Sequence, residues 1–208
     1  MEMQPKWLYW AKQLQSISQA GIEYTSSLYD RERFERIRAL SVEILSEYTE
    51  IDNSRLLNLF ANETGYPTPK IDVRAAIFNS DNEILMVREK LDNKWSLPGG
   101  WADIELTLSE NIIRESFEEA GAKIKPRRVI AIVDRNKHVD DDFPYSAYKI
   151  FVESDFIGGK FTANTETLEN GFFTLETLPE LSEGRNTEEQ IELCFKARKE
   201  ESFEAIFD

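Results

Sequence analysis

The stretch LPGGWADIELTLSENIIRESFEEAGA, residues 97–122, decides how the rest of this chain can fold. It predicts a strand end, a glycine turn, a loop and then a helix. Thr107 and Glu110 match the Thr-x-x-Glu box that caps helix starts, and Gly121 suits the left-handed residue that ends many helices. We therefore expect a helix over residues 108–120. The side chains expected on its buried face are Ile113, Phe117 and Ala120.

The same helix carries three glutamates, Glu115, Glu118 and Glu119, at a spacing that puts them on one helical face. Like charges this close repel one another, and a divalent cation would make the arrangement favourable. Hard oxygen ligands suit Mg²⁺ or Mn²⁺, which keep open positions for water or substrate phosphates. Arg114 lies four residues before Glu118 and can brace it. A glutamate-rich helix facing solvent has the same spacing, so spacing alone leaves both interpretations open.

The composition is that of a globular protein with one full domain and a small appendage: 208 residues, 41% of them hydrophobic and 31% charged. No apolar run approaches the roughly 18 residues needed to span a membrane. The first residues, MEMQPKWLYW, show no signal-peptide pattern, so we expect a cytoplasmic location. The single cysteine, Cys194, excludes an internal disulfide, and its apolar helical position predicts a core residue.

The formal net charge is −14. Nucleic-acid binders carry basic surfaces, so this charge argues against DNA as a partner. Anionic substrates would then need a metal or local arginines in order to bind. The densest basic cluster is either a solvated face or a phosphate-facing patch, and it consists of Arg31, Arg33, Arg36 and Arg38. The single histidine, His138, excludes zinc sites built on two histidines, and we expect it in a loop.

Residues 1–66 are expected to form a small all-helical domain. Its predicted helices cover residues 7–20, residues from about 27 or 30 to 48, and residues 53–62. The residues expected to be buried are Trp7, Trp10, Leu14 and Ile17 in the first helix, and Phe34, Ile37, Ile44 and Tyr48 in the second. A unit this small buries little core alone, so it needs another apolar surface, and we expect a homodimer.

The prolines of YPTPK, residues 66–70, enforce an extended connection to a second domain, which we expect over residues 67–208. A closing helix is expected over residues 186–199, with Thr187 and Gln190 as its capping box. The predicted strands cover residues 73–78, 84–88, 95–97, 129–133 and 147–152, with a short one from residue 172. Strands on both sides of one central helix, followed by a closing helix, predict an α/β or α+β sandwich.

Two segments of the opening stretch resemble the box of the Nudix family, whose hydrolases cleave nucleoside diphosphates linked to another moiety. They are PGG at residues 98–100 and RESFEEAGA at residues 114–122. The family pattern is G-x5-E-x7-R-E-U-x-E-E-x-G-U, in which U is aliphatic. With Gly100 as the first glycine, Arg114 falls in register. The resemblance implies a Nudix α/β/α sandwich.

The chain departs from the family pattern at the first glutamate. Leu106 occupies that position, and Glu105 lies one place early. Ser116 and Ala122 replace aliphatic residues. In the family the first glutamate is more often structural than a metal ligand, and the loop GGWAD is typical of one subfamily. That subfamily is a two-domain bacterial group with an N-terminal helical domain, described as CDP-choline or ADP-ribose pyrophosphatases, and it resembles essentially the whole chain.

The resemblance also implies roles for individual residues. The implied ligands of Mg²⁺ or Mn²⁺ are Glu115, Glu118, Glu119 and the carbonyl of Gly99. The implied catalytic residues are Glu118, Glu119 and, from outside the box, Glu166, with Glu169 as the alternative. Residues interpreted as substrate contacts are Arg74, Arg88 and Trp101, with Phe143 as an alternative stacking residue. Gly100, Arg114 and Gly121 are implied as structural residues of the motif.

Three functional hypotheses follow. The first is hydrolysis of CDP-choline to CMP and phosphocholine. The second is hydrolysis of ADP-ribose to AMP and ribose 5-phosphate. The third is a non-catalytic Nudix domain that senses a nucleotide, against which the intact helix glutamates argue. An RNA end is a further substrate to test, because of the arginine-rich second helix.

Overall fold

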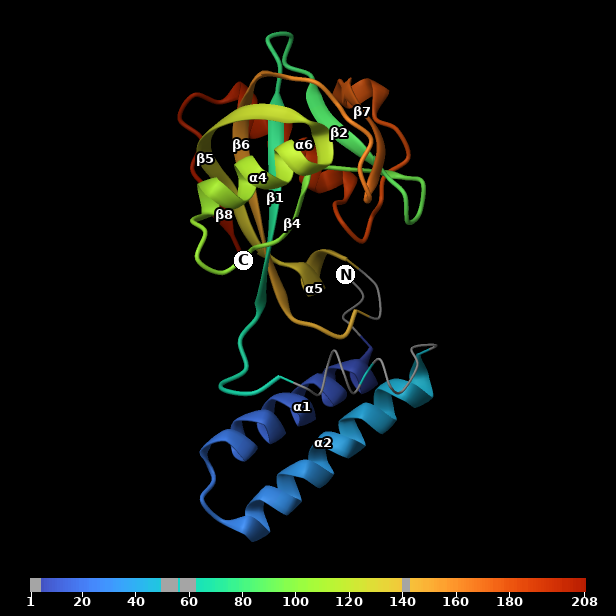
Figure 1. Cartoon of the computed structure of the whole chain (residues 1–208), viewed down its shortest axis with the longest axis vertical. Coiled ribbons are helices and arrows are strands. Elements are labelled where there is room, and N and C mark those ends of the chain that lie inside the picture. The colour runs from blue at the N-terminus through green and yellow to red at the C-terminus, as the bar shows by residue number, and fades with distance from the viewer. Residues whose placement is uncertain (1–4, 50–55, 57–62, 140–142) are drawn as a thin grey trace. The chain divides into compact units, whose positions relative to one another are not determined.

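The computed structural model describes residues 5–49, 56, 63–139 and 143–208 (Figure 1). It divides into two compact units, which we call the helical unit and the sheet unit. The helical unit comprises residues 1–70 and 140–146, and the sheet unit comprises residues 71–139 and 147–208. The helical unit thus ends at residue 70, against residue 66 in the prediction, and it also includes residues 140–146.

The helical unit is built on two adjacent helices, α1 (Lys6–Tyr24) and α2 (Leu28–Tyr48), drawn in blue in Figure 1. Both predicted helices are therefore confirmed. Ser27 caps α2 by accepting a hydrogen bond from the Asp30 N–H. The core of the unit consists of Leu8, Ala11, Val42, Leu45 and Leu56. The third predicted helix, over residues 53–62, lies outside the described residues except for Leu56.

The predicted buried stripe of α1 is wrong for Trp10 and Ile17, whereas Trp7 is partly buried and packs against the core of the unit. Trp10 and Ile17 are 56% and 54% exposed, and Tyr48 of α2 is 60% exposed. The buried positions of α1 are instead Leu8, Ala11, Gln15, Ser18 and Gln19. A helix covers its partner along one narrow stripe only, so two helices with apolar residues on more than one face leave part of that surface uncovered.

The sheet unit contains a mixed sheet, with both antiparallel and parallel strand pairs. Its strands are β1 (Lys70–Phe78), β2 (Ile84–Glu89), β3 (Trp95–Ser96), β4 (Gly99–Trp101), β5 (Ala122–Asp134), β6 (Ala147–Gly159), β7 (Thr167–Phe173) and β8 (Ile206–Phe207). The order is β3-β2-β1-β6-β5-β8, with β4 paired to β1 and β7 paired to β2; β8 runs parallel to β5. The predicted strands are confirmed, several with longer bounds.

Helices pack on both faces of this sheet. Alternate residues of β1 point to opposite sides: Ala76 and Phe78 join a core with α6 (Glu188–Lys199), and Val73, Ala75 and Ile77 join a core with α4 (Leu108–Ala120). The short elements are α5 (Arg135–His138) and η1 (Leu175–Thr177). The predicted α/β/α sandwich is confirmed.

The closing helix α6 also matches its prediction, with the capping box of Thr187 and Gln190 present. Cys194 is fully buried in the α6 core, as expected, and burial raises the pKa of its thiol. Among the helices that the structure describes, none is long and apolar enough to cross a membrane.

Candidate active site

The helix α4 begins and ends where its sequence predicts. The Thr107 hydroxyl accepts a hydrogen bond from the Glu110 N–H, and the Glu110 carboxylate accepts one from the Thr107 N–H at 2.8 Å. Gly121 ends the helix at φ +63°, and a Cβ there would lie 2.1 Å from the Lys160 carbonyl oxygen. The capping box and the glycine together fix the length and direction of the helix that carries the glutamates.

The buried face of α4 differs from the prediction. Ile113 and Phe117 are 42% and 58% exposed, whereas Ala120 is buried as expected. The buried residues are Asn111, Ile112, Glu115, Ser116, Glu119 and Ala120. The sheet lies on the side of Ser116, whose hydroxyl donates to the Ile112 carbonyl at 2.6 Å. Two of the carboxylates are therefore on the protein side of the helix, and the interpretation of a purely solvent-facing glutamate face is wrong for them.

The glycine turn brings main chain directly against these carboxylates. The Gly99 N–H donates to Glu119 Oε2 at 2.8 Å. Gly99 has φ +144°, and a Cβ there would lie 2.0 Å from the Val73 carbonyl oxygen. A Cβ at Gly100 would lie 3.4 Å from Glu115 Oε2. Glycine at position 99 is thus required by close approach as well as by backbone conformation, whereas a Cβ at Gly100 would make only van der Waals contact.

Glu119 is a buried carboxyl, 6% exposed, and burial raises its pKa to about 8. Arg74 and the Gly99 N–H oppose this shift, while the charges of Glu89 and Glu115 add to it. Arg74 is also buried; its Nε lies 2.8 Å from Asp72 Oδ1, and its Nη1 donates to the Leu97 carbonyl at 3.2 Å. Arg74 therefore supports the glycine turn from within the protein.

Arg114 has three acidic neighbours. Its Nη2 lies 2.8 Å from Glu115 Oε1, its Nη1 forms an ion pair with Asp103, and its Nε lies 3.8 Å from Glu118 Oε2. The predicted bracing of Glu118 is therefore the longest of these contacts. Burial raises the pKa of Glu115; Arg114 opposes the shift, and the charges of Glu118 and Glu166 add to it. Sequence reasoning missed Asp103, although its place in GGWAD was visible.

The two carboxylates outside the box occupy different surroundings. The charge of Glu166 adds to the raised pKa of Glu115. Its loop is held by Asn164, whose Oδ1 accepts from the Glu166 N–H at 2.9 Å and whose Nδ2 donates to the Glu119 carbonyl at 3.1 Å. Glu169 instead pairs with Arg88 at 2.7 Å. The loop of Glu166 is thus tied to the end of α4 through Asn164, whereas the Glu169 carboxylate is engaged by Arg88.

The remaining predicted residues lie on β2, on β4, at the end of α5 and in the helical unit. Trp101 ends β4 opposite Asp72 and is 46% exposed. Arg88 also donates to Asn93 Oδ1 at 3.0 Å. Phe143 belongs to the helical unit. The prediction of a loop is wrong for His138, which ends the short helix α5, and its Nε2 lies 2.6 Å from Asp208 Oδ2. The roles of these side chains in substrate binding stay predictions.

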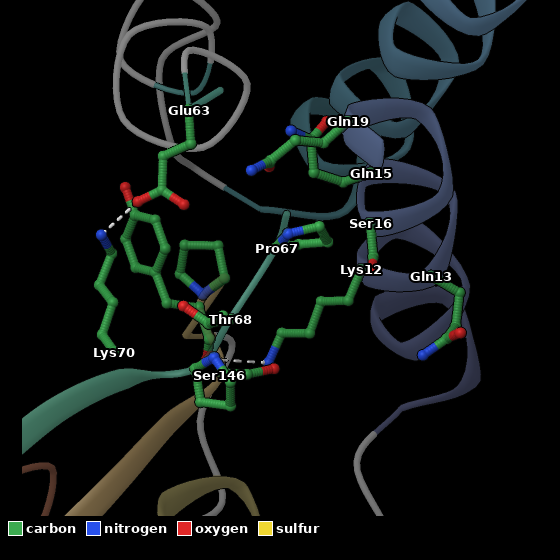
Figure 2. A pocket seen from close by; sticks show the side chains of 13 residues that line it. Lys12, Gln13, Gln15, Ser16, Gln19, Glu63, Pro67, Thr68, Lys70 and Ser146 are labelled. Carbon is green, nitrogen blue, oxygen red and sulfur yellow. Dashed lines mark hydrogen bonds and ion pairs between the residues drawn. The ribbon is translucent and has the colours of Figure 1, made fainter. Parts of the chain in front are cut away.

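The helical unit contains a polar pocket (Figure 2), lined by one face of α1, the connection before β1 and residues 144–146. Its volume is about 230 Å³. Lys12 donates to the Tyr145 carbonyl at 3.4 Å, Lys70 pairs with Glu63, and Gln19 donates to the Gly65 carbonyl at 3.1 Å. These contacts all lie within the helical unit. The residues that line the pocket offer hydrogen-bond partners but no group of carboxylates, so the helix α4 is the candidate active site.

The donor chemistry of the α4 site fits a hard divalent cation. Glu115 and Glu119 are buried carboxylates, and burial raises the pKa of each. The charges of Glu118 and Glu166 add to the raised pKa of Glu115, and the charges of Glu89 and Glu115 add to that of Glu119. Across residues 5–49, 56, 63–139 and 143–208, no three acidic, histidine or cysteine side chains already form a group that could hold a metal. Mg²⁺ needs only one or two carboxylates beside water and substrate phosphate, so this arrangement is compatible with it.

Comparison with known families agrees with this geometry. Residues 68–193 match the family described as the NUDIX domain. Residues 5–60 match the family described as the UDP-X-like N-terminal oligomerisation domain. The two matches correspond to the sheet unit and the helical unit.

Individual relatives cover between two thirds and all of the chain. A Bacillus subtilis protein named "Putative ADP-ribose pyrophosphatase YjhB" is 41% identical over 208 residues, all of both chains. A crystal structure titled UDP-X diphosphatase is 31% identical and covers 98% of each chain, with a TM-score of 0.63. The structure of an ADP-ribose pyrophosphatase from Streptococcus suis is 45% identical and covers 68% of this chain and all of its own, with a TM-score of 0.62.

Proposed function

This chain belongs to the Nudix hydrolase family, and we propose that it hydrolyses the pyrophosphate of ADP-ribose or of a pyrimidine nucleoside diphosphate such as CDP-choline. The observation that carries the proposal is the contact between the glycine turn and a buried carboxylate, Gly99 N–H to Glu119, beside Glu115. It brings main chain and carboxylates together where a phosphate-bound cation would be held.

Each of the two substrates has its own support. The full-length relative at 41% identity carries ADP-ribose pyrophosphatase in its name, which favours AMP and ribose 5-phosphate as products. The structure that covers 98% of both chains is titled UDP-X diphosphatase, which favours a uridine diphosphate derivative. CDP-choline, which would give CMP and phosphocholine, shares with it a pyrimidine base.

The chain's own residues supply distinct parts of the reaction. Glu115, Glu118, Glu119 and the Gly99 carbonyl would hold Mg²⁺ or Mn²⁺. When bound, such an ion lowers the pKa of water and neutralises charge on the leaving phosphate. Glu118, 59% exposed at its side chain, faces the solvent from which substrate arrives. Glu166 would accept the proton of the attacking water; its support is the loop geometry, since Asn164 links the Glu166 N–H to the Glu119 carbonyl.

A substrate panel tests this proposal. Purified full-length protein with Mg²⁺ or Mn²⁺ is offered ADP-ribose, CDP-choline, a UDP-sugar and a short 5′-triphosphorylated RNA, and products are identified by mass spectrometry. We expect cleavage within one of the pyrophosphates, at a rate reduced by about 10²–10³-fold in Glu118→Gln. Glu169→Gln is the matched control, since that carboxylate pairs with Arg88. Hydrolysis by Glu118→Gln at the wild-type rate would contradict the metal assignment.

The panel also tests the non-catalytic hypothesis and the RNA hypothesis. Binding of a nucleotide without turnover would favour a sensor. Cleavage of the RNA end would favour the interpretation of the α2 arginine cluster as a phosphate-binding patch. In the structure, Arg33 pairs with Asp30 at 2.5 Å, and Arg31 donates to the Ile22 carbonyl at 3.0 Å. These local partners make the patch a weaker phosphate site than its composition suggests.

We further propose that the protein is a homodimer assembled through the helical unit. The support is the match to a domain described as an oligomerisation domain, together with exposed apolar side chains on one stripe of α1. That stripe consists of Trp10, Ile17 and Tyr24, seven residues apart and each more than half exposed. Sedimentation velocity at micromolar concentration should give a dimer; a monomer would contradict the proposal.

A further inference from the structure

The loop between the glycine turn and α4 lacks the acidic residue that the family pattern puts there. Leu106 stands at the position of the first box glutamate, yet Arg114 keeps its place in the box. A guanidinium beside the metal ligands without an acidic partner in that loop would be free to pair fully with Glu115 and Glu118. The structure shows which residue provides that partner.

Asp103 is the loop residue that contacts Arg114. Its Oδ2 forms an ion pair with Arg114 Nη1, while Arg114 Nη2 contacts Glu115 at 2.8 Å. Arg114 Nε has no hydrogen-bond partner among the described residues, and the nearest carboxylate oxygen, on Glu118, lies 3.8 Å away. The guanidinium therefore contacts the loop and Glu115 more closely than Glu118, whose ion pair with Nε is the longest of the three.

The main chain around Asp103 is fixed to the helix by a buried side chain. Asn111 is 1% exposed, and its Oδ1 accepts from the Asp103 N–H at 2.8 Å. Its Nδ2 donates to the carbonyls of Leu106 at 3.2 Å and Thr107 at 3.1 Å. Between these anchors, Glu105 adopts φ +66°, which reverses the chain. Asp103 is thus held in position by the fold, independently of its contact with Arg114.

We propose that Asp103 is the positioning residue that replaces the missing box glutamate and orients Arg114 away from Glu118. This inference rests on the proposed pyrophosphatase function. Asp103 acts through Arg114 and does not itself contact substrate or metal. Its charge balances Arg114, so Glu118 keeps its oxygens for the cation. Leu106 is compatible with the site because the acidic partner comes from three residues earlier in the loop.

Asp103→Asn should release Arg114 toward the ligands. We expect kcat to fall by about 10–100-fold, as for other residues that orient metal ligands, with the Mg²⁺ concentration for half-activation rising by a similar factor. The KM for substrate at saturating Mg²⁺ should change much less. Both side chains are partly exposed, 53% for Asp103 and 35% for Arg114, so the fold should survive. The neighbouring Glu105→Gln is the matched control and should leave kcat unchanged.

The decisive variant is the double substitution. Leu106→Glu returns the family's glutamate to its position, so Asp103→Asn in that background should recover kcat to within about threefold of wild type, since a nearby carboxylate again pairs with the guanidinium. A merely structural role for Asp103 predicts no such rescue. The proposal is overturned if Asp103→Asn alone retains full kcat, or if Leu106→Glu fails to restore it.

Mn²⁺ binding, followed by electron paramagnetic resonance without substrate, separates this inference from the proposed function. Weaker Mn²⁺ binding by Asp103→Asn, restored by Leu106→Glu, supports the positioning role even if none of the tested pyrophosphates is cleaved. Equal Mn²⁺ binding by wild type and Asp103→Asn overturns it, even if the wild type is an active pyrophosphatase.

Discussion

The loop–helix segment, residues 97–122, and the helix pair α1–α2 differ in the kind of polar side chain that they bury. The loop–helix segment buries carboxylates, Glu115 and Glu119, and leaves the apolar Ile113 and Phe117 exposed. The helix pair buries uncharged polar residues such as Gln15, and it too leaves large apolar side chains exposed. Burial of charge without a full set of opposite charges costs free energy, whereas buried amides with hydrogen bonds cost little.

This difference separates a site from a scaffold. In the loop–helix segment, the cost of burying Glu119 is offset only in part by Arg74 and the Gly99 N–H, which leaves a carboxyl with a raised pKa. In the helix pair, Ser41 donates to Gln15 Oε1 at 3.4 Å, and Gln19 donates to main-chain carbonyls. Strained electrostatics of the first kind are typical of functional sites. Substitutions in the two regions should therefore differ in size and in pH dependence.

The largest contrast is expected between two glycines with positive φ. Gly99→Ala puts a Cβ 2.0 Å from a main-chain carbonyl oxygen, whereas a Cβ at Gly65, φ +81°, meets nothing within 4 Å. We expect Gly99→Ala to lower the free energy of unfolding by about 3–5 kcal/mol and Gly65→Ala by about 1 kcal/mol. Urea denaturation measures both. Equal losses would show that the turn relaxes and that close packing at Gly99 is not decisive.

A smaller effect with a definite sign is expected for the buried carboxyl. Glu119 has a pKa of about 8 in the folded protein against 4.5 as its ordinary value, so the native state binds the extra proton. Its contribution is fully present below pH 4.5 and is lost as the pH rises through 8. Glu119→Gln cannot titrate, so without metal its stability relative to wild type should increase by on the order of 1–3 kcal/mol between pH 5 and pH 9.

The measurement is the difference in urea midpoint between Glu119→Gln and wild type across this pH range. Added Mg²⁺ is the control, since a cation that binds the ionised carboxylate stabilises the wild type alone and should shrink the difference at pH 9. A difference that does not change with pH would mean that Glu119 is ionised at all of these pH values. In the helical unit, Gln19→Leu should show no such pH dependence, because the side chain carries no charge.

Local sequence signals predicted the main elements of the loop–helix segment well. The capping box at Thr107 and the left-handed Gly121 are confirmed because they depend on residues close in the chain. The alternating strands and the closing helix are confirmed for the same reason. The site glutamates were predicted from spacing and from the family resemblance, and their metal roles stay predictions.

The errors share one physical cause. Ile113, Phe117, Trp10 and Ile17 were expected inside because apolar periodicity marks a face that something covers. Periodicity does not say whether that cover is the same chain or another molecule. Asp103 was missed for a related reason: its contact with Arg114 spans eleven residues of an irregular loop, where no period exists. Both kinds of information depend on tertiary or quaternary contacts.

The smallest expected effect concerns the loop between the glycine turn and α4, which carries Asp103 and has Leu106 in place of the first box glutamate. Glu105 adopts φ +66°, a left-handed conformation that costs a side-chain-bearing residue about 1–2 kcal/mol. Glu105→Gly relieves this cost. It also increases the conformational entropy of the unfolded chain, which lowers the free energy of unfolding by about 0.5–1 kcal/mol. A net gain of about 0.5 kcal/mol in the free energy of unfolding follows. The control is Asn82→Gly at φ +59°, which should gain nothing, because asparagine tolerates this conformation. If both variants gain equally in urea denaturation, the strain is not specific to Glu105, and the loop is as relaxed as an ordinary turn.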